Sequence, residues 1–166
     1  TNISYRLGEK IVSNDDIVQK VIECSTDYKE DLDQLLDQIY FYLDRGGAQE
    51  RRWLSEDQRP IQMIGDAVTE VLEESNIDKE EVELIIHVGL GRAFMEAGQS
   101  YFIAQALNMN SVHCFDIMDA CNSWSRGMMV AYGFMKSGLY KRILIVNTEC
   151  NICLLYTSDA ADELSC

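Results

Sequence analysis

The stretch that decides the fold is His113-Cys-Phe-Asp-Ile-Met-Asp-Ala-Cys-Asn-Ser-Trp124. An apolar run typical of a strand ends near Met118, and a long apolar helical pattern begins around Cys121. Cys121 is therefore expected where a strand turns into a helix N-terminus, beside free backbone N–H groups and the positive end of the helix dipole. Such a setting lowers the pKa of a thiol and makes it a nucleophile. The pattern predicts that Cys121 is the candidate nucleophile.

The segments around this junction alternate between strand and helix patterns. Strands are predicted at residues 82–88, 112–118 and 142–147, and helices at 98–107 and 121–137. This alternation predicts right-handed crossovers and a parallel sheet, which is an α/β fold. The helix at 121–137 is apolar nearly all round, with Arg126 and Lys136 its only charges. Such a helix is expected to be buried on most sides, between two sheets.

The first half of the chain is predicted to be mainly helical. Ser13 to Asp16 offer caps for a helix whose apolar stripe follows at once. Residues 27–43 repeat apolar side chains at helical spacing, and Gly46-Gly47 then ends that helix. Pro60 fits the first turn of a third helix, which runs to about Ser75. The remaining segments are expected as a strand tail at residues 1–7 and as a loop or edge strand at residues 49–53.

Composition limits the class of protein. The 166 residues are 47% apolar, which is enough for one domain with a core. The 28 acidic and 14 basic residues give a net charge of −14, which argues against nucleic acid or an anionic membrane as a partner. No apolar run approaches the roughly 20 residues of a membrane span, and no signal peptide opens the chain. The six cysteines are therefore expected to be reduced thiols of a cytoplasmic protein.

The C-terminal residues break the pattern. Residues 153–163 resemble the translation of a transposon-based sequencing adaptor over all eleven positions. We therefore expect residues 1–152 to be one truncated domain and residues 153–166 to be a non-native tail, although a genuine short amphipathic end remains an alternative. Cys150 and Cys153 form a C-x-x-C pair, a weak metal or redox signal that loses its meaning in this interpretation, and no metal site is predicted.

From Arg45 to Cys150, the order of features resembles β-ketoacyl-acyl-carrier-protein synthase III of the thiolase-like superfamily. Four segments carry the resemblance: Arg45-Gly-Gly-Ala-Gln-Glu-Arg51, Glu83-Leu-Ile-Ile86, Phe115-Asp-Ile-Met-Asp-Ala-Cys-Asn-Ser-Trp124 and Ser137-Gly-Leu-Tyr-Lys-Arg-Ile-Leu-Ile-Val146. From Ala97 onwards the family's pattern fits without a gap. The resemblance implies a thiolase-like fold of two similar halves in α/β/α/β/α layers. This chain would be the N-terminal half, with a buried central helix that carries Cys121 at its N-terminus.

The resemblance also implies a reaction. Cys121 would take an acyl group from acyl-CoA, and the carbanion of a decarboxylated malonyl-carrier-protein thioester would attack the acyl-enzyme, as in fatty acid or polyketide-type biosynthesis. The Cys121 backbone N–H would serve in the oxyanion hole. The family's His and Asn lie in the second half, and His87 and His113 do not match them. The fragment alone is thus expected to be inactive, and the full-length protein to be a homodimer that uses CoA or phosphopantetheine thioesters without a cofactor.

Two further positions match the family's substrate tunnel. Arg45 matches a position at the mouth of the CoA tunnel, where a cation can meet a nucleotide phosphate. Phe41 stands where the family often has a tryptophan that stacks on the adenine. One departure lies beside the nucleophile, where Asp119-Ala-Cys-Asn-Ser-Trp124 replaces the commoner Ala-Ala-Cys-Ser/Ala-Gly-Phe. This difference suggests a specialised synthase.

Two alternatives stay open at this point: a non-catalytic thiolase-fold partner subunit, and a plain α/β binding domain with Cys121 in its core. Adjacent strand residues point to opposite faces, so His113 and Cys114 are not expected to form a dyad. The remaining polar and thiol residues receive supporting roles. His87 is expected to be hydrogen-bonded, Asp116 to cap or orient backbone, Asp119 to accept N–H bonds ahead of the helix, and Cys24 and Cys114 to be structural.

Overall fold

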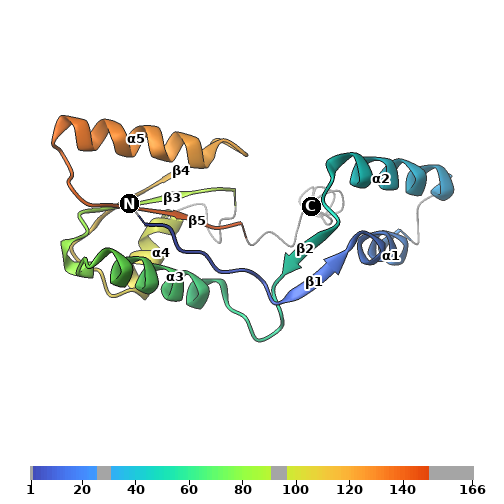
Figure 1. Cartoon of the computed structure of the whole chain (residues 1–166), viewed down its shortest axis with the longest axis horizontal. Helices are drawn as coiled ribbons and strands as arrows, with labels where there is room; N and C mark the ends of the chain where they lie inside the picture. Colours follow the sequence, from blue (N-terminus) through green and yellow to red (C-terminus); the bar gives the residue numbers. More distant parts are fainter. Residues whose placement is uncertain (1, 26–30, 91–96, 150–166) are drawn as a thin grey trace, which may run out of the picture. The chain divides into compact units, whose positions relative to one another are not determined.

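A computed structural model describes residues 2–25, 31–90 and 97–149 of the chain. They form two compact units (Figure 1), a larger one of residues 2–6, 58–90 and 97–149 and a smaller one of residues 7–25 and 31–57. In these ranges, no helix combines the length and apolarity that a bilayer span needs. The predicted tail at 153–166 lies outside the described residues, and both the tail and the single domain at 1–152 stay predictions.

The larger unit is built on a parallel three-stranded sheet in the order β4-β3-β5. Its strands are β3 (Leu84–Val88), β4 (His113–Ile117) and β5 (Ile143–Asn147). All residues of β3 are buried, because the strand is paired on both edges and covered on both faces. The three strands predicted from the apolar runs are confirmed, each a residue or two shorter than expected.

Helices cover both faces of this sheet. Helix α5 (Ser123–Ser137) lies on one face, and α3 (Pro60–Ser75) and α4 (Gln99–Ala106) lie on the other (Figure 1). Side chains of β3 alternate accordingly, with Ile86 packing toward α5 and Ile85 toward α3 and α4. The connection from β3 to β4 and the one from β4 to β5 cross the sheet in opposite directions. Right-handed crossovers therefore place α4 and α5 on opposite faces, and the predicted α/β class is confirmed.

Helix α3 begins and ends where the sequence predicted. Pro60 occupies its first turn, where a missing N–H costs no hydrogen bond. Ile64 and Val68 are buried on its inner side, and Asn76 ends it in a left-handed conformation with φ of 50°. A 3-10 turn, η1 (Lys79–Glu81), then leads toward β3.

Helix α5 approaches the sheet through small side chains. Ser123, Gly127 and Ala131 recur every fourth residue and are buried. A Cβ atom at Gly127 would lie 2.6 Å from Val88 Cγ1, so the helix backbone lies very close to β3. The other sides expose large apolar residues, namely Trp124, Met128, Met129, Tyr132 and Met135. Burial on most sides was expected, but the described residues of the larger unit cover only one side of α5.

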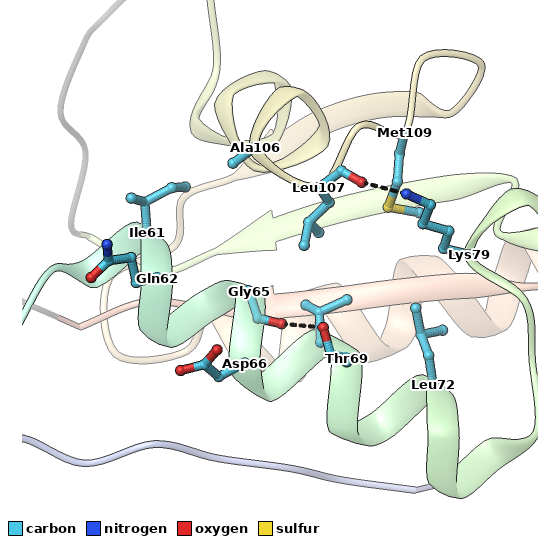
Figure 2. A pocket seen from close by; sticks show the side chains of 11 residues that line it. Ile61, Gln62, Gly65, Asp66, Thr69, Leu72, Lys79, Ala106, Leu107 and Met109 are labelled. Atoms are coloured by element: carbon cyan, nitrogen blue, oxygen red, sulfur yellow. Dashed lines mark hydrogen bonds between the residues drawn. The ribbon is translucent and has the colours of Figure 1, made fainter.

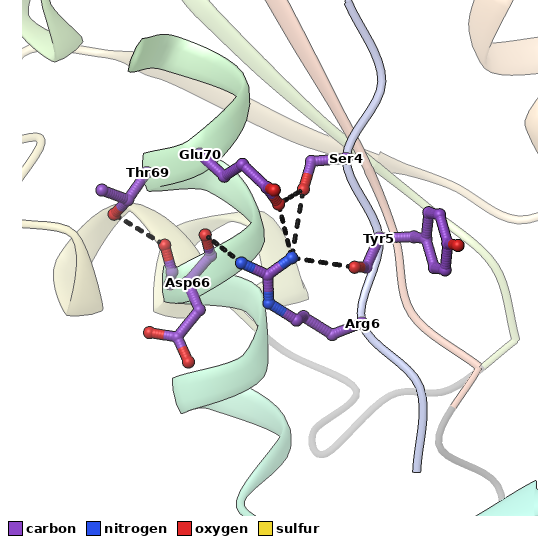
Figure 3. A network of polar contacts seen from close by, with 7 residues as sticks. Ser4, Tyr5, Arg6, Asp66, Thr69 and Glu70 are labelled. Atoms are coloured by element: carbon purple, nitrogen blue, oxygen red, sulfur yellow. Dashed lines mark hydrogen bonds and ion pairs between the residues drawn. The ribbon is translucent and has the colours of Figure 1, made fainter. Parts of the chain in front are cut away.

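The N-terminal residues of the larger unit lie against α3 (Figure 3). Ser4 and Arg6 donate hydrogen bonds to the Glu70 carboxylate, and Arg6 also donates to the Asp66 carbonyl oxygen at 3.3 Å. These bonds hold the pKa of Glu70 below its ordinary value. Residues 2–7 form no strand, so the strand tail expected here is wrong. The segment is anchored by side chains to a helix rather than by a backbone ladder.

The smaller unit pairs two short strands and two helices. Strand β1 (Lys10–Ser13) runs antiparallel to β2 (Glu50–Trp53), and α1 (Asn14–Cys24) and α2 (Leu32–Gly46) lie between them in the chain. Ser13 caps α1 as predicted: the Asp16 N–H donates to Ser13 Oγ at 3.1 Å, and the Ser13 N–H donates to Asp16 Oδ2 at 2.7 Å. Helix α2 begins at Leu32, after its N-cap Asp31, and ends before Gly47 as predicted, while residues 27–30 of the predicted helix lie outside the described residues. Residues 49–53, expected as a loop or edge strand, contain β2.

Candidate active site

Cys121 lies on a tight turn between β4 and α5. The Asn122 N–H donates to the Asp119 carbonyl oxygen at 2.9 Å, and the Ser123 N–H donates to the Ala120 carbonyl oxygen at 3.2 Å. Ala120 has φ of +46°, a left-handed conformation that is strained for a residue with a Cβ atom. The Cys121 thiol is free and exposed. The turn therefore presents this thiol to solvent beyond the carboxyl end of β4.

A buried hydroxyl closes the turn. Ser123 is 2% exposed, and its Oγ accepts the Asp119 N–H at 2.8 Å and donates to the Ala120 carbonyl oxygen at 2.8 Å. Helix α5 begins at Ser123, with Asn122 as its N-cap. The sequence placed the first helical residue at Cys121, two positions too early. Cys121 thus belongs to the turn before the helix, which explains its exposure.

The Asp119 carboxylate is paired with an arginine. Asp119 Oδ2 accepts from Arg126 Nε at 3.0 Å and lies 2.9 Å from Arg126 Nη2, and it also accepts from Asn122 Nδ2 at 3.4 Å. This carboxylate was expected to accept N–H bonds ahead of the helix, and it accepts them from the side chains of Asn122 and Arg126, because Arg126 reaches back along α5. The sequence did not lead us to predict the Asp119–Arg126 pair, although residues seven apart, about two helical turns, lie on the same side of a helix.

A buried polar network joins the three strands near their carboxyl ends. His87 on β3 is fully buried, with Nε2 2.7 Å from Thr148 Oγ1 and Nδ1 3.3 Å from Asp116 Oδ2. The Asp116 carboxylate accepts the N–H groups of Gln99 and Ser100 at 2.7 and 3.0 Å, and the Ser100 hydroxyl at 2.6 Å. These N–H groups open α4 and have no partner within the helix. The expectations for His87 and Asp116 are both confirmed.

The charge of Asp116 is stabilised despite burial. Burial raises the pKa of this carboxyl, but the hydrogen bonds from Ser100 and Gln99 and the neighbouring His87 together hold its pKa below the ordinary value. Asp116 is therefore ionised at neutral pH and acts as an anchor for α4. A residue held in the ionised form by several donors is poorly suited to donate a proton in a reaction.

The other described thiols differ in environment. Burial, followed by the charge of Asp116, raises the pKa of Cys114, and its Sγ lies 3.7 Å from the Val112 carbonyl oxygen. Cys114 is thus structural, as predicted. Cys24 was expected to be structural too, but it is exposed because it is the last residue of α1, beyond the buried Ile17 and Val18. Cys150 lies outside the described residues.

The remaining site residues of the sequence prediction lie elsewhere. Phe41 and Arg45 are one turn apart on α2, with the guanidinium carbon 6.0 Å from the ring centroid. Both belong to the smaller unit and Cys121 to the larger one, so their role at a CoA tunnel stays a prediction. His113 Nδ1 lies 2.7 Å from the Tyr140 hydroxyl, which agrees with the absence of a local dyad with Cys114.

A hollow of about 520 Å³ lies between α3 and α4 (Figure 2), on the face of the sheet opposite α5. Ile61, Gly65, Leu72, Leu107 and Met109 are among its lining residues. Lys79, at its edge, donates to the Leu107 carbonyl oxygen at 3.1 Å. Cys121 does not line it, so this hollow is not the site of thiol chemistry. Within the described ranges, no group of three or more His, Cys, Asp and Glu side chains is arranged to hold a metal ion.

Sequence comparison agrees with the resemblance. The family described as 3-Oxoacyl-[acyl-carrier-protein (ACP)] synthase III matches residues 115–161, a range that includes Cys121 and runs into the predicted tail. A β-ketoacyl-[acyl-carrier-protein] synthase III of Fusobacterium nucleatum is 28% identical over 169 residues, which cover 96% of this chain and 47% of that protein. The protein of the same name from Pseudoalteromonas atlantica is 31% identical over 107 residues, covering 64% of this chain and 34% of that protein.

Solved structures show the same fold. The crystal structure of 3-oxoacyl-[acyl-carrier-protein] synthase III from Aquifex aeolicus matches with a TM-score of 0.69 and 26% identity, over 89% of this chain and 42% of that chain. OleA from Xanthomonas campestris matches with a TM-score of 0.69 at 19% identity, which supports the fold alone. The chain spans about half the length of the curated relatives it matches.

Proposed function

We propose that Cys121 is the acyl-accepting residue of an enzyme of the β-ketoacyl-[acyl-carrier-protein] synthase III type, and that this chain is its N-terminal half. The chain matches slightly less than half the length of such proteins in sequence and fold, which supports the proposal. The observation that carries the proposal is the setting of the thiol. Cys121 is exposed on a strained turn that is closed by the buried Ser123 hydroxyl, directly before α5.

The proposed first step is acyl transfer. The Cys121 thiolate attacks the carbonyl carbon of an acyl-CoA thioester, a new C–S bond forms, and the CoA thiolate leaves. The negative charge that develops on the carbonyl oxygen needs N–H donors, and the backbone N–H of Cys121 is one candidate, next to the N-terminus of α5. The result is a thioester between the acyl group and Cys121.

The proposed second step is a decarboxylating Claisen condensation. A malonyl-carrier-protein thioester loses CO₂, and the electron pair of the broken C–C bond becomes a carbanion. The carbanion attacks the acyl carbonyl on Cys121, a C–C bond forms, and the Cys121 thiolate leaves. The family resemblance implies that the His and Asn that assist this step belong to the second half of the protein, so the 166-residue chain alone is expected to be inactive.

The substrates follow from the same proposal. Acyl-CoA would be the acyl donor and malonyl-acyl-carrier protein the acceptor, in fatty acid or polyketide-type biosynthesis. The exposed Phe41 ring and the neighbouring Arg45 guanidinium suit the adenine and phosphates of CoA, since a ring can stack and a cation can pair. The assembled enzyme would be a cytoplasmic homodimer that needs no cofactor.

One alternative is disfavoured and one stays open. An α/β binding domain with Cys121 in its core disagrees with the exposure of this thiol. A non-catalytic thiolase-fold partner subunit would share the fold and the turn, so a chemical test is needed to separate it from the enzyme.

The test is uptake of an acyl group by the longer protein that contains this chain. After incubation with acetyl-CoA, mass spectrometry is expected to find one acetyl group on the peptide that carries Cys121. Cys121→Ala should abolish the uptake, and Cys24→Ala, which removes another exposed thiol, should leave it unchanged. A folded protein that takes up no acyl group would instead support the non-catalytic subunit. Acetylation that persists in the Cys121→Ala protein would refute the assignment.

A further inference from the structure

A carboxylate, that of Asp119, stands near Cys121 in the sequence. Asp119 stands two residues before the nucleophile, in the same turn, and a β-bridge contact joins the backbones of the two residues. A bare carboxylate at this position would oppose formation of a thiolate, because like charges at short range repel. An enzyme that depends on this thiolate would need to compensate that charge.

Arg126 supplies the compensation. Its guanidinium meets one oxygen of Asp119 through two nitrogens, at 3.0 Å from Nε and 2.9 Å from Nη2. The two side chains are 48% and 41% exposed, so the pair is only partly screened by water. Because Arg126 lies on α5 and Asp119 lies before it, the pair also ties the turn to the helix.

We propose that Arg126 is a positioning residue that balances the charge of Asp119 and holds the turn, so that the Cys121 thiolate forms beside a neutral pair. This inference rests on the proposed function of Cys121. Arg126 acts through Asp119, and no contact of Arg126 with substrate is required. The assignment explains why a carboxylate is tolerated beside the nucleophile in Asp119-Ala-Cys121.

Other titratable groups near the carboxyl ends of the strands are held by different partners. His87 on β3 and Asp116 on β4 contact each other and the start of α4, on the face of the sheet away from α5. Glu149, after β5, accepts the Leu90 N–H at 3.3 Å. Further along α5, Lys136 lies over the Tyr132 ring at 5.6 Å. The Asp119–Arg126 pair is therefore the charge arrangement that the turn itself contains.

The test is the pH dependence of Cys121 alkylation by iodoacetamide, followed by mass spectrometry on the full chain. Arg126→Gln is expected to move the midpoint of the profile upward by about half to one pH unit, which corresponds to roughly three- to tenfold slower alkylation near neutral pH. Asp119→Asn should move the midpoint downward. The double variant should return it close to the wild-type value, because both charges are then absent. Cys24, which is exposed on α1, should keep its rate in every variant.

A purely structural role for Arg126 predicts different results. If the guanidinium only holds the turn, the alkylation midpoint of the double variant would differ from wild type at least as much as that of Arg126→Gln. A double variant whose midpoint does not return toward the wild-type value would therefore overturn the proposal. Equal midpoints in wild type and Arg126→Gln would overturn it as well. Should Arg126→Gln fail to fold, Asp119→Asn alone decides, since an unchanged or raised midpoint contradicts the proposal. Alkylation is measured without acyl-CoA, so it is independent of acyl uptake. If the pH profile of alkylation shifts as expected but no acyl group is taken up, the proposed function is refuted and the inference about Arg126 is not.

Discussion

Adding one methyl group at Gly127 tests how α5 lies on the sheet. Gly127 is buried on the inner side of α5, and a Cβ atom there would lie 2.6 Å from Val88 Cγ1 and 3.7 Å from Ile145 Cγ2. Real Cβ atoms essentially never approach a heavy atom to 2.6 Å, so one of the two elements must move. Val88 lies in the central strand with 0% of its surface accessible, so its side chain cannot shift away from the added methyl group.

The magnitude follows from two opposing effects. Alanine is better than glycine inside a helix by about 1 kcal/mol. Overpacking a well-packed core costs about 1–3 kcal/mol, and a contact this short belongs in the upper part of that range. Gly127→Ala should therefore lower the free energy of unfolding by about 1–2 kcal/mol. Gly133 on the same helix is the matched control, because a Cβ there meets nothing within 4 Å. Gly133→Ala should raise the free energy of unfolding by about 0.8–1 kcal/mol.

Urea unfolding followed by far-ultraviolet circular dichroism measures both variants. The expected result is a lower midpoint for Gly127→Ala and a higher one for Gly133→Ala, with unchanged slopes. Val88→Ala provides a second check, since it removes the clashing Cγ1 atom and should cancel most of the cost of Gly127→Ala in a double-mutant cycle. If both glycine variants were stabilised equally, the close approach of α5 to β3 would be refuted.

Two further perturbations test the smaller unit and the buried network. Ser13→Ala removes the acceptor of the Asp16 N–H at the start of α1 and should cost about 1 kcal/mol of unfolding free energy in urea; an unchanged midpoint would contradict the cap. The pKa of Asp116 lies below its ordinary value of 3.8, so its contribution to stability is present above that pH and is lost as the pH falls through the lower folded value. Asp116→Asn should therefore be less stable at neutral pH, yet lose less stability on acidification than wild type. An equal loss of unfolding free energy on acidification in the two proteins would contradict this role.

Local chemistry along the chain determined most of the secondary structure. Apolar runs predicted β3, β4 and β5, and the caps at Ser13, Pro60 and Gly47 predicted where three helices begin or end. These features depend on hydrogen bonds and backbone preferences within a few residues, so sequence alone could place them. The position of Cys121 after β4 was predictable for the same reason, although the helix start was two residues early.

The tertiary structure decided which distant groups meet. Asp116 reaches the start of α4, and His87 reaches Thr148, because β3 lies between β4 and β5 in a register that no short segment specifies. The exposure of α5 could not be predicted from its apolar pattern either, since burial depends on which layers are present to cover it. Sequence by itself thus determined the elements and the thiol at their junction. Only the packed sheet brought His87 together with Asp116 and Thr148, because these contacts join residues that are far apart in the chain.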